Sequence, residues 1–269
     1  MLTLESIRLR AQRSGLRIGL GVGVDVEKAK RAKMEAEDLG FADVLLYNDA
    51  RQLAEDLLNG RIDAAVRGDI DSNRAMEAVR RSFQITKVLR AAFMQPREGR
   101  MFLLAPVGID EGWTIAEKVE IARLSDRLMR RLDIEPQVGF MSGGRASDRG
   151  RMAEIDRSIE AAEAATEIAS SEGIRARDVQ VLIEDAARDC DVIVAPDGVS
   201  GNLIFRTLHF LGGAAALGAP VLNIDRVYID TSRAKAPTGT PSCWPPPWRP
   251  CAEASFRKAN IMIMVSLAP

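Results

Sequence analysis

Short apolar runs alternate with amphipathic helical segments through most of the 269 residues. The runs that read as strands span 16–23, 42–49, 62–69, 100–108, 136–144, 191–196 and 220–232. The segments that read as helices span 26–40, 50–60, 73–91, 114–133, 152–173 and 203–218, while 179–190 starts as a strand or as a buried helical turn. This alternation is typical of an α/β protein built on a parallel sheet, and it predicts that fold class.

Charge and composition narrow the range of partners. The formal net charge is −1, so no overall field attracts nucleic acid or anionic lipid. No apolar stretch approaches the ~18 residues of a membrane span, and the charged N-terminal segment lacks a secretory apolar region. The three cysteines form no closely spaced pair, and there is one histidine, His209. We therefore expect a cytoplasmic protein with no metal site, no nucleic-acid partner and no membrane partner.

Three glycine-containing turns follow predicted strands. The first, Gly19-Leu-Gly21-Val-Gly23, lacks the spacing of a dinucleotide-binding loop, and it favours tight strand–helix packing over cofactor binding. The second, at 141–151, places Ser142, Gly143, Gly144 and Arg145 before a helix, as an anion cradle would. An equally good interpretation is a solvated loop whose arginines pair with acids at 148 and 156.

The third turn ends the apolar run at 192–195. Asp197 lies where parallel sheets bind ligands, beyond the carboxyl end of a strand. Gly198 and Gly201 would let the backbone approach a ligand closely. Ser200 or Asn202 can cap the following helix, which leaves Asp197 and the second glycine for another role.

A further candidate is the sequence YIDTSRA at 228–234. Arg233 at a strand end can grip a phosphate with two hydrogen bonds, and Ser232 beside it can hydrogen-bond a reacting carbonyl. Taken alone, the same residues are as typical of a surface turn.

Together, PDGVSGN and IDTSRA resemble the phosphate acetyl/butyryltransferase family, whose members carry a P-D-x-x-x-G-N turn and a later D-x-S-R strand end. The combination resembles still more closely the methanogenesis marker protein 4 family, an archaeal family named as a methyltransferase subunit X. The resemblance covers most of residues 15–235. It implies a two-domain architecture like that of isocitrate dehydrogenase, with a cleft between the domains. The first domain would comprise 1–109 with 226–269, and the second, inserted domain 110–225.

The resemblance also implies roles for particular residues. Ser232 and Arg233 would handle an acyl phosphate together with Asp197. The substrate-binding residues would be Gly198, Gly201, Asn202, Arg206 and the loop residues Ser142, Gly143, Gly144 and Arg145. At least two of the arginines at 145, 206 and 233 would face one cleft. Two departures weaken acetyl transfer to phosphate, because Phe210 and Gly239 stand where acetyltransferases carry an arginine and an aspartate.

Four functions fit this pattern. The first is an acyltransferase of the phosphate acetyltransferase-like class, with a small anionic substrate, coenzyme A as a candidate second substrate and a homodimeric assembly. The second is a methyltransferase component of methanogenesis. The third is a binding protein on the same fold without catalysis, and the fourth is a nicotinamide-dependent dehydrogenase, whose paired metal-binding aspartates we cannot assemble from the sequence.

The segment 234–269 departs from the rest of the chain. It holds clustered prolines, two of the three tryptophans and two of the three cysteines, and no polar–apolar period. Prolines at that density exclude regular structure, so we expect residues after about 236 to be irregular. Either the segment is a proline-rich binding loop, or a reading-frame slip has replaced the original C-terminus.

Overall fold

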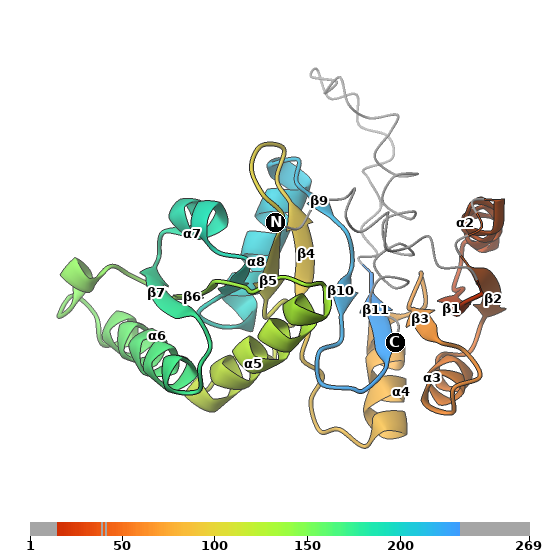
Figure 1. The fold of residues 1–269 in the computed structure, drawn as a ribbon, viewed down its shortest axis with the longest axis horizontal. Coiled ribbons are helices and arrows are strands. Elements are labelled where there is room, and N and C mark those ends of the chain that lie inside the picture. The colour runs from red at the N-terminus through yellow and green to blue at the C-terminus, as the bar shows by residue number, and fades with distance from the viewer. Residues whose placement is uncertain (1–14, 39, 41, 232–269) are drawn as a thin grey trace. The chain divides into compact units, whose positions relative to one another are not determined.

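A computed structural model describes residues 15–38, 40 and 42–231 (Figure 1). These residues divide into two compact units, one made of 86–225 and the other of 15–85 with 226–231. The sequence places the boundary after residue 109, whereas in the structure the segment 86–109 belongs to the same unit as 110–225. The reason is strand pairing, because the two strands in this segment form part of that unit's sheet.

The larger unit, residues 86–225, contains a six-stranded sheet of order β7-β6-β8-β5-β4-β9. Its strands are β4 (Ala92–Gln95), β5 (Phe102–Ala105), β6 (Val138–Met141), β7 (Ala176–Gln180), β8 (Val192–Val194) and β9 (Ala215–Ala216). Strands β5, β8, β6 and β7 run parallel, and β4 and β9 pair antiparallel at one side. A further short strand, β10, spans Ala219–Pro220.

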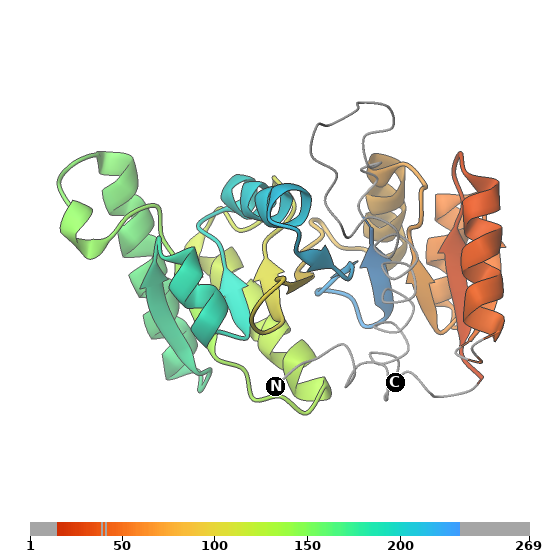
Figure 2. The same cartoon turned by 90° about the horizontal axis from the view of Figure 1, so that it is seen from above.

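Helices cover both faces of this sheet. They are α5 (Ile115–Arg131), α6 (Ala153–Ser171), α7 (Ile183–Asp189) and α8 (Gly198–Arg206), with a 3₁₀ turn at Ala146–Asp148 and a π-helical turn at Thr207–Leu211. Helices α5 and α6 lie on one face, and α7 and α8 lie on the other (Figure 2). Phe93, Phe102 and Phe140 are among the largest fully buried side chains, so the core lies between the sheet and these helices.

In the smaller unit the strands β1 (Arg17–Gly21), β2 (Asp43–Tyr47), β3 (Ala64–Val66) and β11 (Val227–Asp230) pair parallel in the order β11-β3-β1-β2. Its helices are α2 (Val26–Asp38), α3 (Ala50–Leu58) and α4 (Ser72–Phe83). Helix α2 lies on one face, and α3 and α4 lie on the other. Right-handed crossovers produce this arrangement when successive connections run in opposite directions across the sheet.

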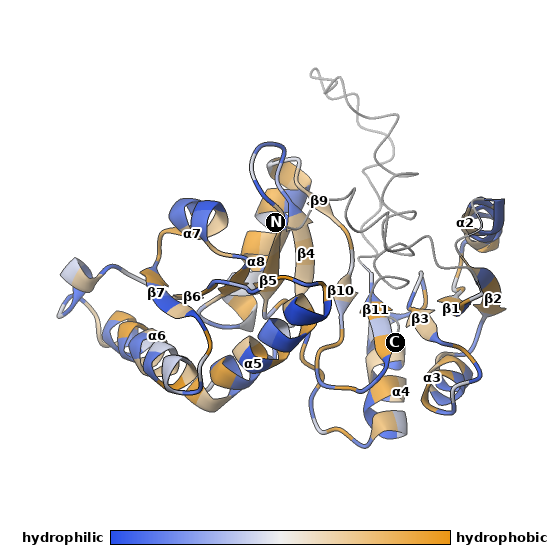
Figure 3. Cartoon of the chain, viewed as in Figure 1, coloured by the Kyte–Doolittle hydropathy of each residue, from blue (hydrophilic) through white to orange (hydrophobic). Residues whose placement is uncertain are grey.

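Hydropathy follows burial in both units. Apolar colour is concentrated on the strands, while α2 is largely hydrophilic (Figure 3). Parallel strand pairing confirms the α/β fold with a parallel-sheet core in each unit. The predicted tail from residue 234 onward lies outside the described residues.

Candidate functional site

The segments that follow β6 and β8 carry all the described candidate residues of the larger unit, and the loop that follows β5 packs against the second of these segments. These three strands are neighbours and run parallel, so their carboxyl ends share one edge of the sheet. Ligands of open α/β sheets bind beyond this edge. The sequence therefore places its candidates on loops that the fold brings to one edge.

Asp197 begins helix α8 as its N-cap. One of its carboxylate oxygens accepts a hydrogen bond of 2.8 Å from the backbone N–H of Ser200, and the other accepts one of 3.0 Å from the Ser200 hydroxyl. The expectation that Ser200 or Asn202 caps the helix is wrong, since Asp197 does so. Capping alone therefore gives Asp197 a structural role.

The two glycines of α8 pack against the loop that follows β5. A Cβ on Gly198 would lie 1.9 Å from the carbonyl oxygen of Gly108, and one on Gly201 would lie 1.9 Å from that of Pro106. Asn202 reinforces this contact, because its side-chain amide donates a 2.9 Å hydrogen bond to the Val107 carbonyl. Contact with the chain's own loop accounts for both glycines without a bound ligand.

Arg206, at the end of α8, lies beside the aromatic residue that replaces the expected arginine. Its guanidinium carbon is 5.1 Å from the centroid of the Phe210 ring, within the range of a cation–π contact. Phe210 belongs to the π-helical turn and is 38% exposed. The substitution therefore leaves an exposed arginine that is oriented by an aromatic ring instead of paired with an acid.

The loop after β6 satisfies most of its own polar groups. The Ser142 hydroxyl donates to the Gly144 carbonyl over 2.8 Å, and the Gly143 N–H donates to the Ser158 hydroxyl over 2.9 Å. The N–H of Arg145 donates to Asp148, while the Arg145 side chain is exposed.

The contacts of this loop agree in part with the solvated-loop interpretation. Arg151 pairs with Asp148 over 2.7 Å, as the solvated-loop interpretation expects, whereas Arg149 pairs with Glu163. Asp156 accepts from the backbone N–H of Gly150 instead of from an arginine side chain. An anion cradle here would depend on the exposed side chain of Arg145.

Two buried charged residues at the same edge have no clear sequence signal. Glu111 is fully buried after β5 and accepts hydrogen bonds from the backbone N–H and the Nε of Arg90. Lys118 is 5% exposed, and its Nζ donates a 2.7 Å hydrogen bond to the Gly112 carbonyl. Burial raises the pKa of Glu111 and lowers the pKa of Lys118, and Asp197 opposes the second shift through its charge. Only three-dimensional packing reveals these two residues, since neither lies in a motif.

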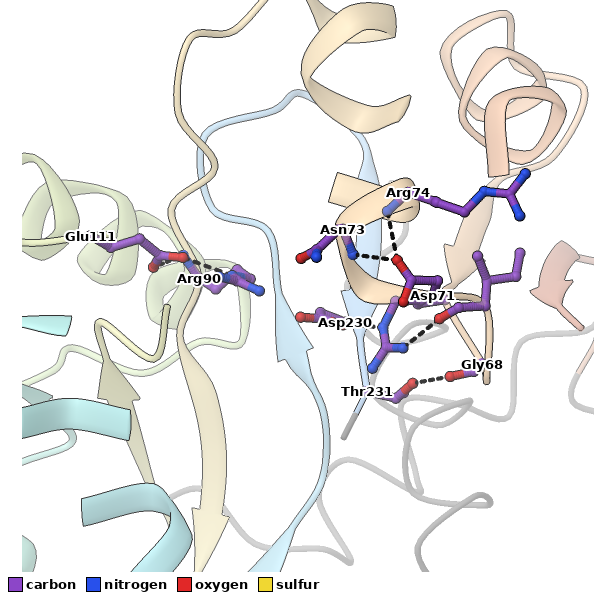
Figure 4. Close-up of polar contacts among 10 residues, drawn as sticks. Gly68, Asp71, Asn73, Arg74, Arg90, Glu111, Asp230 and Thr231 are labelled. Atoms are coloured by element: carbon purple, nitrogen blue, oxygen red, sulfur yellow. Dashed lines mark hydrogen bonds and ion pairs between the residues drawn. The ribbon is translucent and has the colours of Figure 1, made fainter. Parts of the chain in front are cut away.

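In the smaller unit, the carboxyl ends of β1, β3 and β11 form a second edge. Arg67, directly after β3, forms a buried ion pair with Asp230, the aspartate of the D-T-S-R sequence (Figure 4). Thr231 donates a 2.7 Å hydrogen bond from its hydroxyl to the Gly68 carbonyl. Ser232 and Arg233 lie outside the described residues, so their predicted roles stay predictions.

The glycine-rich loop after β1 surrounds a carboxylate of the chain itself. Asp69 accepts hydrogen bonds of 2.6, 2.8 and 2.8 Å from the backbone N–H groups of Gly23, Val24 and Asp25. A Cβ on Gly23 would lie 2.4 Å from the Asp69 carbonyl oxygen, so this position has no room for one. The three amides that could hold a ligand phosphate are occupied, which agrees with the tight-packing interpretation.

Comparison with known proteins identifies the family. No family model matches the chain. A protein of Methanosarcina acetivorans named "Putative methyltransferase mtx subunit X" is 39% identical over 249 residues, which cover 86% of this chain and 89% of the relative. The protein of the same name from Methanosarcina mazei is 37% identical over the same shares. The chain belongs to the mtx subunit X family.

More distant matches of the chain are phosphate acyltransferases. A phosphate acetyltransferase of Corynebacterium glutamicum is 23% identical over 258 residues, covering 84% of this chain and 77% of the relative. The structure of a branched-chain phosphotransacylase from Enterococcus faecalis superposes with a TM-score of 0.68 at 13% identity, covering 95% of this chain and all of that one. The phosphate acetyltransferase-like fold and the archaeal family indicated by the sequence are thus confirmed.

Two features are absent from the residues that the structure describes in this mtx subunit X family member. Among them, no cluster of three or more histidine, cysteine, aspartate or glutamate side chains gathers as a metal site would require. No helix within the same residues has the length and apolar content of a membrane span.

Proposed function

We propose that this protein binds an acyl phosphate and coenzyme A and transfers the acyl group between them. The observation that supports this most is the likeness of fold to a phosphotransacylase over 95% of the chain. In the proposed reaction the coenzyme A thiol attacks the acyl carbonyl carbon. The new carbon–sulfur bond replaces the carbon–oxygen bond to phosphate, and the thiol proton leaves with inorganic phosphate.

Charge stabilisation and positioning would supply most of the catalysis, as they do in other group transfers. From the family resemblance we assign the acyl phosphate to Ser232 and Arg233, and we keep Asp197 as a candidate catalytic residue. Arg206 and Arg145 are candidates for binding the anionic substrate, because both side chains are exposed and neither has an ion-pair partner among the described residues. Gly198, Gly201, Asn202, Ser142, Gly143 and Gly144 would shape the loops around the substrate.

Ligand-induced stabilisation tests the binding step. Phosphate, acetyl phosphate and coenzyme A should each raise the melting temperature, because a ligand at about 100 times its Kd stabilises the folded state by roughly 2.7 kcal/mol. Arg233→Ala should lose this stabilisation and the formation of thioester. Arg157→Ala is the matched control, since Arg157 is 68% exposed and pairs with Glu154 on the surface of α6. Unchanged melting with all three ligands at millimolar concentration would exclude the proposal.

Methyl transfer is the second candidate, and the names of the relatives favour it. The same melting assay, with S-adenosylmethionine as the added ligand, separates the two. Stabilisation by S-adenosylmethionine but not by coenzyme A would favour methyl transfer. Stabilisation by coenzyme A without any thioester formation would favour a binding protein that lacks catalysis.

Location and assembly belong to the same proposal. We place the protein in the cytoplasm, where coenzyme A and acyl phosphates are available, and we expect a homodimer from the resemblance of fold. Sedimentation of the purified chain tests the dimer, and a monomer at every concentration would contradict it.

A further inference from the structure

Arg67 is a charged residue that the fold buries almost completely. It follows β3 directly and is 2% exposed. Its Nε donates to a carboxylate oxygen of Asp230, and its Nη1 donates to the Ile70 carbonyl over 2.6 Å. Its backbone N–H donates to the Ile229 carbonyl over 3.0 Å. A buried guanidinium is stable only when it is paired and hydrogen-bonded, and each of these contacts contributes to that.

Two tethers join the end of β11 to the turn that contains Arg67. The first is the ion pair at Asp230, and the second is the hydrogen bond from the Thr231 hydroxyl to the Gly68 carbonyl (Figure 4). Asp230 and Thr231 are the two residues that immediately precede Ser232 and Arg233 in the chain. The tethers therefore fix the last described residues before the candidate acyl-phosphate residues.

The turn itself is held firmly. Gly68 has φ of +60°, and a Cβ there would lie 1.9 Å from the Gly21 carbonyl oxygen, so the turn packs against the end of β1. Asp69 binds three backbone N–H groups of the glycine-rich loop. The turn at 67–69 thus links the carboxyl ends of β1, β3 and β11, and Arg67 extends from a rigid base.

We propose that Arg67 is a positioning residue, which fixes Asp230 and Thr231, the two residues from which the chain continues to Ser232 and Arg233, and which thereby supports the catalytic role proposed for those two. This inference rests on the proposed acyl transfer. Arg67 acts through Asp230 and does not contact the substrate. A planar guanidinium that donates in two fixed directions suits this task, whereas a lysine ammonium keeps the charge but not the fork.

The test compares Arg67→Lys and Arg67→Met with a control in the same unit. Tyr47→Phe serves as that control, because it removes a buried hydrogen bond of 2.9 Å between the Tyr47 hydroxyl and Asp56. Both Arg67 variants should lower kcat by roughly 10- to 100-fold with little change in KM, because a displacement of about 1 Å at reacting groups costs on that order. Tyr47→Phe should leave kcat within about twofold of the wild type, since its hydrogen bond plays no part in transition-state stabilisation.

Hydrogen exchange gives a readout that does not depend on activity. In the Arg67 variants, backbone amides of 226–231 should exchange faster, while those of β2 should stay protected as in the wild type. Wild-type kcat in Arg67→Lys, or unchanged exchange at 226–231 in Arg67→Met, would overturn the inference. If the wild type itself transfers no acyl group, the proposed function fails, and the positioning role for Ser232 and Arg233 fails with it. If the wild type is active and the Arg67 variants match it, the inference fails while the proposed function stands.

Discussion

At the residue scale, Asp69 shows how one side chain can close a loop that looks ready for a ligand. Glycines after a first strand are typical of phosphate-binding loops, and the amides of residues 23–25 do converge on an anion. That anion is the carboxylate of Asp69, which lies 44 residues beyond Asp25 in the chain. The glycine spacing favoured packing over cofactor binding, but no sequence pattern could identify the residue that fills the loop.

Asp69→Asn should destabilise the protein by about 1.5–3 kcal/mol at neutral pH, because the amide side chain loses charge-assisted hydrogen bonds. Burial raises the pKa of Asp69, but the hydrogen bonds from Gly23, Asp25 and Val24 outweigh it and hold the pKa below 3.8. A carboxylate whose pKa is lowered by folding stabilises the fold at pH values above its ordinary pKa. That stability is lost as the pH falls through the pKa of the folded state. The difference between wild type and variant should therefore shrink below about pH 4.

Urea unfolding at neutral and acidic pH measures this difference. Asp38→Asn is the control, because Asp38 is an exposed carboxylate at the end of α2. Equal stability of wild type and Asp69→Asn at neutral pH would show that the amides do not depend on the carboxylate.

At the element scale, the sequence predicted that the region of α8 is helical but placed both ends of the helix wrongly. The pattern predicts a helix over 203–218, but the helix begins at Gly198 and ends with a π-helical turn at Leu211. Glycines and polar residues at 198–202 are typical of a loop, and only the packing against 106–111 explains them. The helix predicted at 73–91 ends at Phe83, where Gln84 adopts φ of +54°, and the short strand β4 follows unpredicted.

Gly198→Ala separates helix propensity from packing in α8. Alanine favours an isolated helix by about 1 kcal/mol over glycine. The new methyl group would overlap the Gly108 carbonyl, so we expect a net loss of roughly 1–3 kcal/mol. Val199→Ala tests propensity without that clash, since Val199 is 43% exposed. Thermal unfolding measures both variants, and a Gly198→Ala protein as stable as the wild type would mean that the loop at 106–111 yields easily.

The cap of α8 offers a second test of that helix. Asp197→Ala should cost about 0.5–2 kcal/mol, and Asp197→Asn should recover most of it, because asparagine caps helices as well as aspartate does. If Asp197 also takes part in catalysis, Asp197→Asn will combine near-normal stability with a reduced kcat. A large loss of stability in Asp197→Asn would instead mean that the charge is needed, for example opposite the buried Lys118.

At the scale of the whole molecule, the sequence predicted two α/β bodies, one of them built from both ends of the described chain. The boundary was the difficult part, because residues 86–109 read as the end of one alternating pattern and the start of another. The pairing of β5 with β8 and of β4 with β9 decides it, and a period in the sequence cannot show which sheet a strand will join. The ion pair of Arg67 was equally invisible in the sequence, since its partner Asp230 lies 163 residues away.

The division into units predicts that residues 86–225 fold when expressed alone. All six strands of the larger sheet, and all four helices that cover it, come from this continuous segment. Residues 15–85 should not fold alone, because β11, the neighbour of β3, comes from 227–230 and brings the buried Tyr228 and Ile229 with it. Leaving apolar surface of that size exposed forgoes about 1.5–3 kcal/mol for each side chain, against a net stability of roughly 5–15 kcal/mol. Circular dichroism during heating distinguishes the two fragments. We expect a cooperative transition for 86–225 and none for 15–85, and a cooperative transition for 15–85 would show that β11 is dispensable for that sheet.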